Sequence, residues 1–330
     1  MKAKNYISGN RKPVILDTDP GMDDAIALFF LMGRQDILEP VAITTVFGNV
    51  SIDKTTHNAQ KLLKFLDAEE VPVYRGASSP LIRDRVSGEM IHGESGLGEV
   101  DFPEPEKSSD ATSTPAAVAM AKEIMARPGE ITVITVGPMT NLALALKLYP
   151  EIKEQIAEVI VMGGAMGQGN RTASAEYNVF ADPHSAQIVF ESGLSVAMIG
   201  LDVTEQSKPG QKERQLLQKL DHPVATKTLE FMDFFKRQMK TDYDMAFHDP
   251  CAIAYAINPD IFTTRSMDVR IELTGTYTLG RTVCSRGQEE VKGVMGDPDS
   301  RNVKVGLGVD REKFFEELFT SFRKLADTMN

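Results

Sequence analysis

The strongest constraint on the fold is a regular alternation of short apolar runs with longer stretches of helical periodicity. The apolar runs predict six strands, at Val14–Asp17, Val41–Val46, Val71–Tyr74, Ile131–Val136, Val159–Gly163 and Ser195–Gly200. The helical stretches predict helices at Asp23–Met32, Asp53–Leu66, Thr114–Ala126, Met139–Leu148 and Pro183–Ser192. Several runs are apolar throughout, which is typical of strands buried on both faces of a parallel sheet. We therefore expect an α/β fold with an open, mostly parallel sheet and helices on both faces.

The pattern changes after residue 200. Charged helical stretches lie around Gln211–Leu220 and Ala225–Lys240, a hairpin-like stretch lies near Val269–Ser285, and Arg311–Asp327 predicts a closing amphipathic helix. No repeat or linker divides the chain, so we expect a single domain over residues 1–330. The segment 78–113 has little periodicity, and a loop this long is usually functional or mobile. We expect mobile active-site loops near 78–113 and 225–247.

The charge balance limits the possible partners. The net charge is −11, from 47 acidic and 36 basic residues, and no basic patch stands out. Such a surface repels nucleic acid and anionic membranes, so neither is expected as a partner. Two cysteines do not make a disulfide framework, and residues 1–13 lack the apolar core of a signal peptide. No apolar stretch reaches the roughly 18 residues of a membrane span. We expect a cytoplasmic protein.

Four aspartates are concentrated at the end of the first predicted strand. The segment 13–28 reads PVILDTDPGMDDAIAL and contains Asp17, Asp19, Asp23 and Asp24. A capped helix after a turn explains one or two of them, but four carboxylates in eight residues repel one another. A hard divalent cation removes that repulsion, because Ca²⁺ and Mg²⁺ prefer oxygen ligands. Ligands of such sheets bind at the carboxyl ends of the strands, where this cluster lies.

Two classes of metal-dependent enzyme fit the cluster. A strand that ends in DxD also opens phosphohydrolases of the haloacid-dehalogenase type, in which the first aspartate is a nucleophile and Mg²⁺ binds phosphate. In the other class, the carboxylates hold a cation and its water, and one aspartate acts as general base.

Several motifs resemble those of one family. The run DTDPGMDDAIAL closely resembles the signature of the nucleoside hydrolases, the inosine–uridine-preferring N-ribohydrolases. Further segments match in the same order: AITTVFGN (42–49), IHGESGLG (91–98), VGPMTNLA (136–143), VMGGAMGQGN (161–170), AEYNVFADP (175–183) and HDPCAIAY (248–255). The match extends from Val14 to about Tyr255 and implies the Rossmann-like nucleoside hydrolase fold.

The resemblance implies an active-site Ca²⁺ ion. Its ligands would be Asp19, Asp24, Asp249 and the main-chain carbonyl of Val136, where most members have Thr. Asp19 would also be the general base that takes a proton from a water on the cation. Asp17 would support these ligands.

The resemblance also implies contacts to the substrate. Asp23 would hold the ribose 2′-hydroxyl, and Met162 would pack near the sugar. The remaining ribose oxygens would be held by Asn49, Asn170, Glu176 and Asn178. His248 is the candidate acid for the leaving base, and His92 would contact the base. Tyr243 is a weaker candidate for such a contact.

Our main hypothesis is a Ca²⁺-dependent ribonucleoside hydrolase for purine or pyrimidine salvage, acting as a homodimer or homotetramer. It would release ribose and a free base. The alternatives are a Mg²⁺ phosphohydrolase of the haloacid-dehalogenase type and a non-catalytic protein that binds ribose or nucleosides. The sequence leaves open the preference for purine or pyrimidine bases, the exact leaving-group acid, the choice between dimer and tetramer, and the role of the region after about residue 260.

Overall fold

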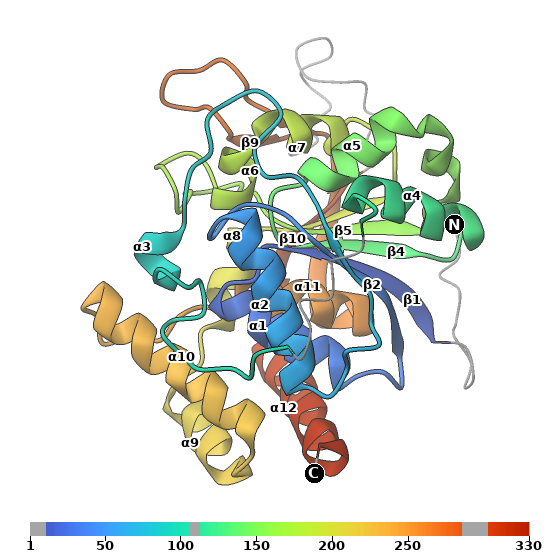
Figure 1. The fold of residues 1–330 in the computed structure, drawn as a ribbon. Coiled ribbons are helices and arrows are strands. Elements are labelled where there is room, and N and C mark those ends of the chain that lie inside the picture. The colour runs from blue at the N-terminus through green and yellow to red at the C-terminus, as the bar shows by residue number, and fades with distance from the viewer. Residues whose placement is uncertain (1–10, 106–112, 286–302, 330) are drawn as a thin grey trace.

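A computed structural model of the protein describes residues 11–105, 113–285 and 303–329. Its centre is an eight-stranded sheet with the order β3-β2-β1-β4-β5-β6-β10-β7 (Figure 1). The strands are β1 (Lys12–Thr18), β2 (Leu38–Thr45), β3 (Val73–Arg75), β4 (Thr132–Thr135), β5 (Glu158–Met162), β6 (Val196–Ile199), β7 (Phe262–Met267) and β10 (Val303–Val309). Only the pairing of β7 with β10 in this sheet is antiparallel. The expected mostly parallel sheet is confirmed.

Helices cover both faces of the sheet. On one face lie α1 (Met22–Met32), α2 (Ile52–Phe65), α11 (His248–Ile257) and α12 (Arg311–Thr328); on the other lie α4 (Ala116–Ala126), α5 (Thr140–Leu148) and α7 (Pro183–Phe190) (Figure 1). Successive residues of β1 enter the two resulting cores, Leu16 on the α1 side and Ile15 on the α5 side. This follows from the two-residue period of a strand, and it explains why the strand sequences are apolar throughout.

The smaller elements connect these layers. The short helices are α3 (Glu89–His92), α6 (Tyr177–Ala181) and α8 (Leu201–Thr204), with 3-10 turns at η1 (Pro150–Gln155), η2 (Glu205–Ser207) and η3 (Pro259–Ile261). The charged helical stretches form α9 (Gln211–Leu220) and α10 (Pro223–Met239). The expected hairpin consists of β8 (Val269–Ile271) and β9 (Thr282–Cys284), which pair antiparallel.

The structure corrects one expected loop and adds two strands to the expected sheet. The loop expected near 225–247 is mostly helix α10, and only residues 240–247 lie outside regular structure before α11 begins. Leu229, Phe231 and Phe234 pack this helix on the core, which is why it is helical. Strands β7 and β10 were not expected. The mobility of segment 78–113 stays a prediction; its described part contains α3 and is otherwise irregular. Among the described helices, none is both long and apolar enough to cross a bilayer.

Candidate active site

The turn between β1 and α1 is held by the carboxylate of Asp24. This side chain accepts hydrogen bonds from the Thr18 hydroxyl (2.5 Å) and from the backbone N–H of Gly21 (2.9 Å). It lies in the first turn of α1, where backbone N–H groups without a helical partner favour an anion. The buried strand β1 therefore ends in a turn that is closed around a carboxylate.

Asp19 is buried at the bottom of this turn with one oxygen free. Its Oδ2 atom accepts a hydrogen bond from the Asn49 backbone N–H (2.7 Å), whereas Oδ1 has no hydrogen-bond partner among the described residues. A Cβ atom on Gly48 or Gly137 would lie 2.0 or 2.3 Å from an Asp19 carboxylate oxygen. Glycines at both positions make room for this carboxylate.

Asp17 lies deeper in the sheet. Its Oδ1 atom accepts hydrogen bonds from the Thr44 hydroxyl (2.7 Å) and from the Asn141 side-chain amide (2.8 Å). Burial raises its pKa to about 7, and the two hydrogen bonds act in the opposite direction. Asp17 thus connects β1 to β2 and α5 below the turn.

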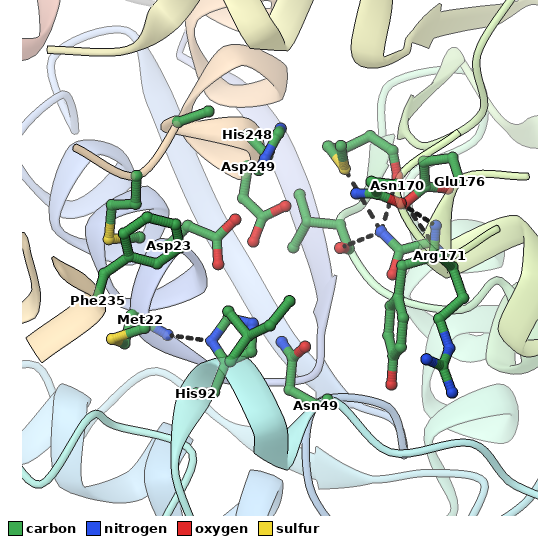
Figure 2. A pocket seen from close by; sticks show the side chains of 18 of the residues that line it. Met22, Asp23, Asn49, His92, Asn170, Arg171, Glu176, Phe235, His248 and Asp249 are labelled. Atoms are coloured by element: carbon green, nitrogen blue, oxygen red, sulfur yellow. Dashed lines mark hydrogen bonds between the residues drawn. The ribbon is translucent and has the colours of Figure 1, made fainter. Parts of the chain in front are cut away.

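Asp249 reaches the aspartate cluster from a distant part of the chain. It stands in the first turn of α11, and its carboxylate forms a group with Asp23 and Asp24 whose ligand oxygens all lie within 4.8 Å of one another. This group contains Asp23 in the place that the sequence analysis gave to Asp19. Figure 2 shows the carboxylates of Asp23 and Asp249 beside each other in the pocket.

The carboxylates of this cluster are poorly stabilised as free anions. Burial, followed by repulsion from neighbouring carboxylates, raises the pKa of Asp23 to about 8 and that of Asp249 well above its usual range. The unpartnered Oδ1 atom of Asp19 adds a buried oxygen without a donor. An all-oxygen set of this kind fits a hard divalent cation, which would supply the missing positive charge.

The carbonyl oxygen of Val136 is a further atom at the site that could bind a cation. Val136 directly follows β4, and its carbonyl accepts a hydrogen bond from the Asn178 side-chain amide (2.8 Å). A carbonyl oxygen has two lone pairs, so one is left for another partner.

A cavity of about 260 Å³ opens above the cluster. Of the residues that the sequence analysis placed in or behind the site, Asp17, Asp19 and Asp24 are buried and do not line the cavity. The others line it: Asp23, Asn49, His92, Val136, Met162, Asn170, Glu176, Asn178, Tyr243, His248 and Asp249 (Figure 2). The carboxyl ends of β1, β4 and β5 thus meet at one pocket, as expected for an open parallel sheet.

Two asparagines brace the pocket with their amide nitrogens. The Nδ2 atom of Asn49 donates to the Asp19 carbonyl (3.1 Å) and the Asp24 carboxylate (3.0 Å). The Nδ2 atom of Asn178 donates to the carbonyls of Val136 and Met162, the second at 3.1 Å. In both side chains the Oδ1 atom is the acceptor left for a ligand.

Glu176 and Asn170 belong to the opposite wall. Glu176 precedes α6, and its carboxylate accepts hydrogen bonds from the backbone N–H groups of Asn178 (2.8 Å), Gly164 (2.9 Å) and Val179 (3.1 Å). Burial raises its pKa against these hydrogen bonds. Asn170 accepts a hydrogen bond from the Tyr177 backbone N–H (2.9 Å).

The two histidines of the pocket are uncharged at neutral pH. Burial lowers the pKa of both His92 and His248 to about 4. The Nδ1 atom of His92 accepts a hydrogen bond from the Met22 backbone N–H (3.2 Å), and His248 Nδ1 lies 2.7 Å from the Thr204 hydroxyl. In each ring, Nε2 is the nitrogen left for a ligand.

Several lining residues were not found from the sequence. Part of the lining is mainly apolar and comes from the neighbouring helices α3 and α10 and from the segment after α10: Met90, Ile91, Phe235, Met239, Tyr243 and Met245. Of these, only Tyr243 was named in the sequence analysis, as a weaker candidate for a contact to the base. The charged lining residues Arg171, Glu205 and Lys208, and Thr204 behind His248, lie in loops or short helices without a sequence pattern that would mark them.

Comparisons with known proteins identify the family of the chain. Residues 14–316 match the family described as inosine-uridine preferring nucleoside hydrolase. The pyrimidine-specific ribonucleoside hydrolase RihA of Shewanella oneidensis is 39% identical over 96% of this chain and 98% of its own.

Solved structures of nucleoside hydrolases have the same fold. A purine-preferring ribonucleoside hydrolase from Gardnerella vaginalis has a TM-score of 0.86 at 32% identity and covers 96% of this chain and 100% of its own. The plant nucleoside hydrolase PpNRh1 has a TM-score of 0.84 at 30% identity and covers 96% of this chain and 99% of its own. The chain belongs to the inosine-uridine preferring nucleoside hydrolase family and is a ribonucleoside N-ribohydrolase.

Proposed function

We propose that this enzyme uses a Ca²⁺ ion held by Asp19, Asp24, Asp249 and the carbonyl of Val136. The observation that carries this proposal is the buried carboxylate cluster at the bottom of the pocket, with its raised pKa values and the unpartnered Asp19 Oδ1. Asp23 is a further candidate ligand because its carboxylate belongs to the tightest group. When bound, the cation would neutralise this cluster, hold sugar hydroxyls and lower the pKa of a water molecule.

Asp19 is the proposed general base. Its Oδ2 atom is fixed by the Asn49 backbone N–H, so Oδ1 has a defined position from which to take a proton from the attacking water. Burial raises the pKa of Asp19 in the absence of a cation; a bound cation would lower this pKa and keep the carboxylate ionised, as a proton acceptor must be. Water attacks C1′ as the bond to the base breaks, and the surrounding carboxylates stabilise the positive charge that develops on the ribose.

The ribose is held by polar groups on both walls. Asp23 would accept from the 2′-hydroxyl, and Asn49, Asn170, Glu176 and Asn178 would hold the other oxygens, with Met162 against the sugar. The amide nitrogens of Asn49 and Asn178 donate to the protein, and no described residue donates to either Oδ1 atom, which supports this role. A sugar without these hydroxyls would leave buried polar groups unpaired, so we propose strict selection for ribose.

His248 is the proposed leaving-group acid. In the neutral tautomer that carries its proton on Nε2, Nδ1 would accept a hydrogen bond from Thr204 and Nε2–H would donate a hydrogen bond to the departing base. His92 would contact the base from α3, and the apolar residues of α10 would pack against it.

We further propose a preference for pyrimidine ribonucleosides, because the relative named as pyrimidine-specific is 39% identical and the structure named as purine-preferring is 32% identical. We also propose that the enzyme acts in nucleoside salvage in the cytoplasm and that it assembles as a homodimer or homotetramer.

A nucleoside panel tests the proposal. Uridine, cytidine, inosine and guanosine are incubated with the enzyme, with Ca²⁺ or with a chelator, and free base and free ribose are measured. We expect base and ribose in equal amounts, faster from pyrimidines, and loss of turnover with the chelator that Ca²⁺ restores. Undiminished turnover in chelator would contradict the cation. Binding without turnover, or release of phosphate from nucleotides in place of base, would support the alternative functions.

A further inference from the structure

A glutamate and a lysine form an ion pair in the lining of the pocket. Glu205 begins η2 and Lys208 directly follows it, and the Lys208 Nζ atom lies 2.5 Å from Glu205 Oε2. Both residues line the pocket of the candidate active site. Their side chains are 47% and 39% exposed, which places the pair at the mouth of the pocket. Because exposed ion pairs contribute little to stability, a role in the fold alone does not account for this pair.

The pair lies where the base of the substrate is proposed to bind. Lys208 Nζ is 5.3 Å from the centre of the Tyr243 ring, which belongs to the apolar part of the lining. The charges of the pair also reach the imidazole of His248. Burial lowers the pKa of His248 most, and beyond this Glu205 raises it and Lys208 lowers it. The pair is therefore close to both the proposed leaving-group acid and the aromatic ring.

Hydrogen bonds hold the backbone of this segment in place. The Ser207 hydroxyl donates to the Thr204 carbonyl (2.7 Å), and the Phe247 backbone N–H donates to the same hydroxyl (3.1 Å). The Nη2 atom of Arg311 donates to the Lys208 carbonyl (2.9 Å). The segment that carries the pair is thus tied to the residue before α11, so the two side chains start from defined positions beside His248.

The two side chains present a hydrogen-bond donor next to an acceptor. An ammonium has three N–H donors and no acceptor, and a carboxylate has acceptors only. Among the described residues, the Glu205 carboxylate accepts a hydrogen bond only from Lys208, so both groups have capacity left for a ligand. Together they carry no net charge, which suits a neutral ligand. The complementary group is a carbonyl next to a ring N–H, as in the O4 and N3–H atoms of uracil.

We propose that Glu205 and Lys208 bind the outer edge of a pyrimidine base and make the enzyme prefer uridine to cytidine. This inference rests on the proposed function. Glu205 is adjacent to Thr204, the partner of His248, so it would accept from N3–H, the nearer of the two groups to the sugar. Lys208, beside the Tyr243 ring, would donate to O4, the outermost atom. In cytosine, N3 carries a lone pair and C4 an amino group, so both contacts would become repulsive.

The contact to O4 also acts during the reaction. Water forms the new C1′–O bond and the C1′–N1 bond breaks, and its electron pair stays on the base. This negative charge spreads from N1 to O2 and O4 until the base gains a proton. An ammonium at O4 faces this charge as it develops, so Lys208 would favour departure of uracil as well as its binding.

Uridine and cytidine are compared as substrates of the wild type, Glu205→Gln and Lys208→Met. We expect kcat/KM of the wild type to be higher for uridine. In each variant the ratio of kcat/KM for uridine to kcat/KM for cytidine should fall about tenfold, the size usual for one hydrogen bond to a charged group. Lys208→Met should also lower kcat for uridine.

Glu230→Gln is the matched control. Lys227 and Glu230 form another ion pair three residues apart (2.9 Å), and Lys227 Nζ lies 5.5 Å from the centre of the Phe102 ring. Neither residue of that pair lines the active-site pocket. This variant should therefore keep the wild-type ratio, and thermal melts show whether all variants are folded.

Calorimetric titration with uracil and with cytosine gives a readout that does not depend on turnover. We expect uracil to bind the wild type more tightly than cytosine, and this difference to shrink in Glu205→Gln. If both nucleosides are cleaved but Glu205→Gln and Lys208→Met keep the wild-type ratio, the pair does not select the base, and the proposed function stands. If no nucleoside is cleaved, the proposed function fails. In that case a uracil preference lost in Glu205→Gln would still support the role of the pair, and equal binding of the two bases would overturn it.

Discussion

The hydroxyl of Thr204 and the Nδ1 atom of His248 lie 2.7 Å apart. Thr204 ends α8, which follows β6, and His248 begins α11, so this hydrogen bond joins two elements at the back of the pocket. It fixes the orientation of the imidazole and leaves Nε2 for a ligand. No sequence pattern marks Thr204, yet it determines which nitrogen of His248, the proposed leaving-group acid, faces the substrate.

Replacing Thr204 by valine tests this arrangement. We expect kcat for uridine to fall about tenfold with little change in KM, because the ring loses its orientation but the ribose contacts remain. The control is Thr228→Val, which removes a buried hydroxyl that donates to the Val224 carbonyl in α10 (2.8 Å) and does not line the pocket. Steady-state kinetics with a thermal melt separate the two effects. Equal kcat values for both variants would show that Thr204 only stabilises the fold.

The space around Asp19 gives a second prediction. In Gly48→Ala, the new Cβ would lie 2.0 Å from Asp19 Oδ2, so the carboxylate must move. Because misplacement of a catalytic group by about 1 Å costs roughly 100-fold, we expect kcat to fall about 100-fold. Gly308→Ala is the control, since Gly308 is half-buried in β10 and the atom nearest to its new Cβ would be 3.8 Å away. Unchanged turnover in a folded Gly48→Ala variant would mean that the position of Asp19 is not critical.

The parts of the fold that could be predicted from the sequence are those with a strong apolar pattern. Strands β1, β4, β5 and β6 are buried on both faces, so their residues are largely apolar in succession. Strand β7 reads FTTRSM with four exposed residues between two buried ones, and β10 reads VKVGLGV with two glycines. Neither has the apolar run that marks the other strands, and β7 lies at the edge of the sheet, where only one side is paired.

In the candidate site, too, only some of the residues could be predicted from a local sequence pattern. Asp17, Asp19, Asp23 and Asp24 are close in sequence, so the turn that brings them together was predictable from spacing. Asp249 joins them through the packing of α11 on α1, which no local pattern contains, and only the family resemblance indicated it. The carboxylate that lies with those of Asp24 and Asp249 could be that of Asp19 or that of Asp23, depending on how the side chains are directed around the first turn of α1. The spacing of the aspartates in the sequence does not determine these directions.

The buried carboxylates predict how stability depends on pH and cation. The pKa values of Asp17 and Asp23 are raised to about 7 and about 8, from 3.8 in an unfolded chain. The folded state therefore binds these protons more tightly, and the metal-free protein loses stability as pH rises through this range. The pKa values of His92 and His248 are lowered to about 4 from 6.5, so these groups reduce stability only as pH falls below about 6.5.

Melting curves between pH 6.5 and 8 isolate the carboxylates. With a chelator, we expect Tm to fall across this window. With saturating Ca²⁺, Tm should rise, and by more at pH 8 than at pH 6.5, because a cation binds the ionised carboxylates and competes with protons. A Ca²⁺-induced shift of equal size at both pH values would contradict a site built on these groups.

Asp19 and Asp23 have different expected roles, and paired amide variants distinguish them. In Asp19→Asn, the group formed by Asp23, Asp24 and Asp249 is intact, so Ca²⁺ and ribose should still bind. Turnover should fall by about 10²- to 10⁴-fold, because an amide does not accept a proton from water. Asp23→Asn removes a member of the tightest carboxylate group, and we expect weaker binding of Ca²⁺ or ribose and a raised KM. Calorimetry measures the binding and steady-state kinetics the turnover. Near-normal turnover in Asp19→Asn would exclude Asp19 as the base, and the unpartnered Oδ1 would then have to be explained by cation binding alone.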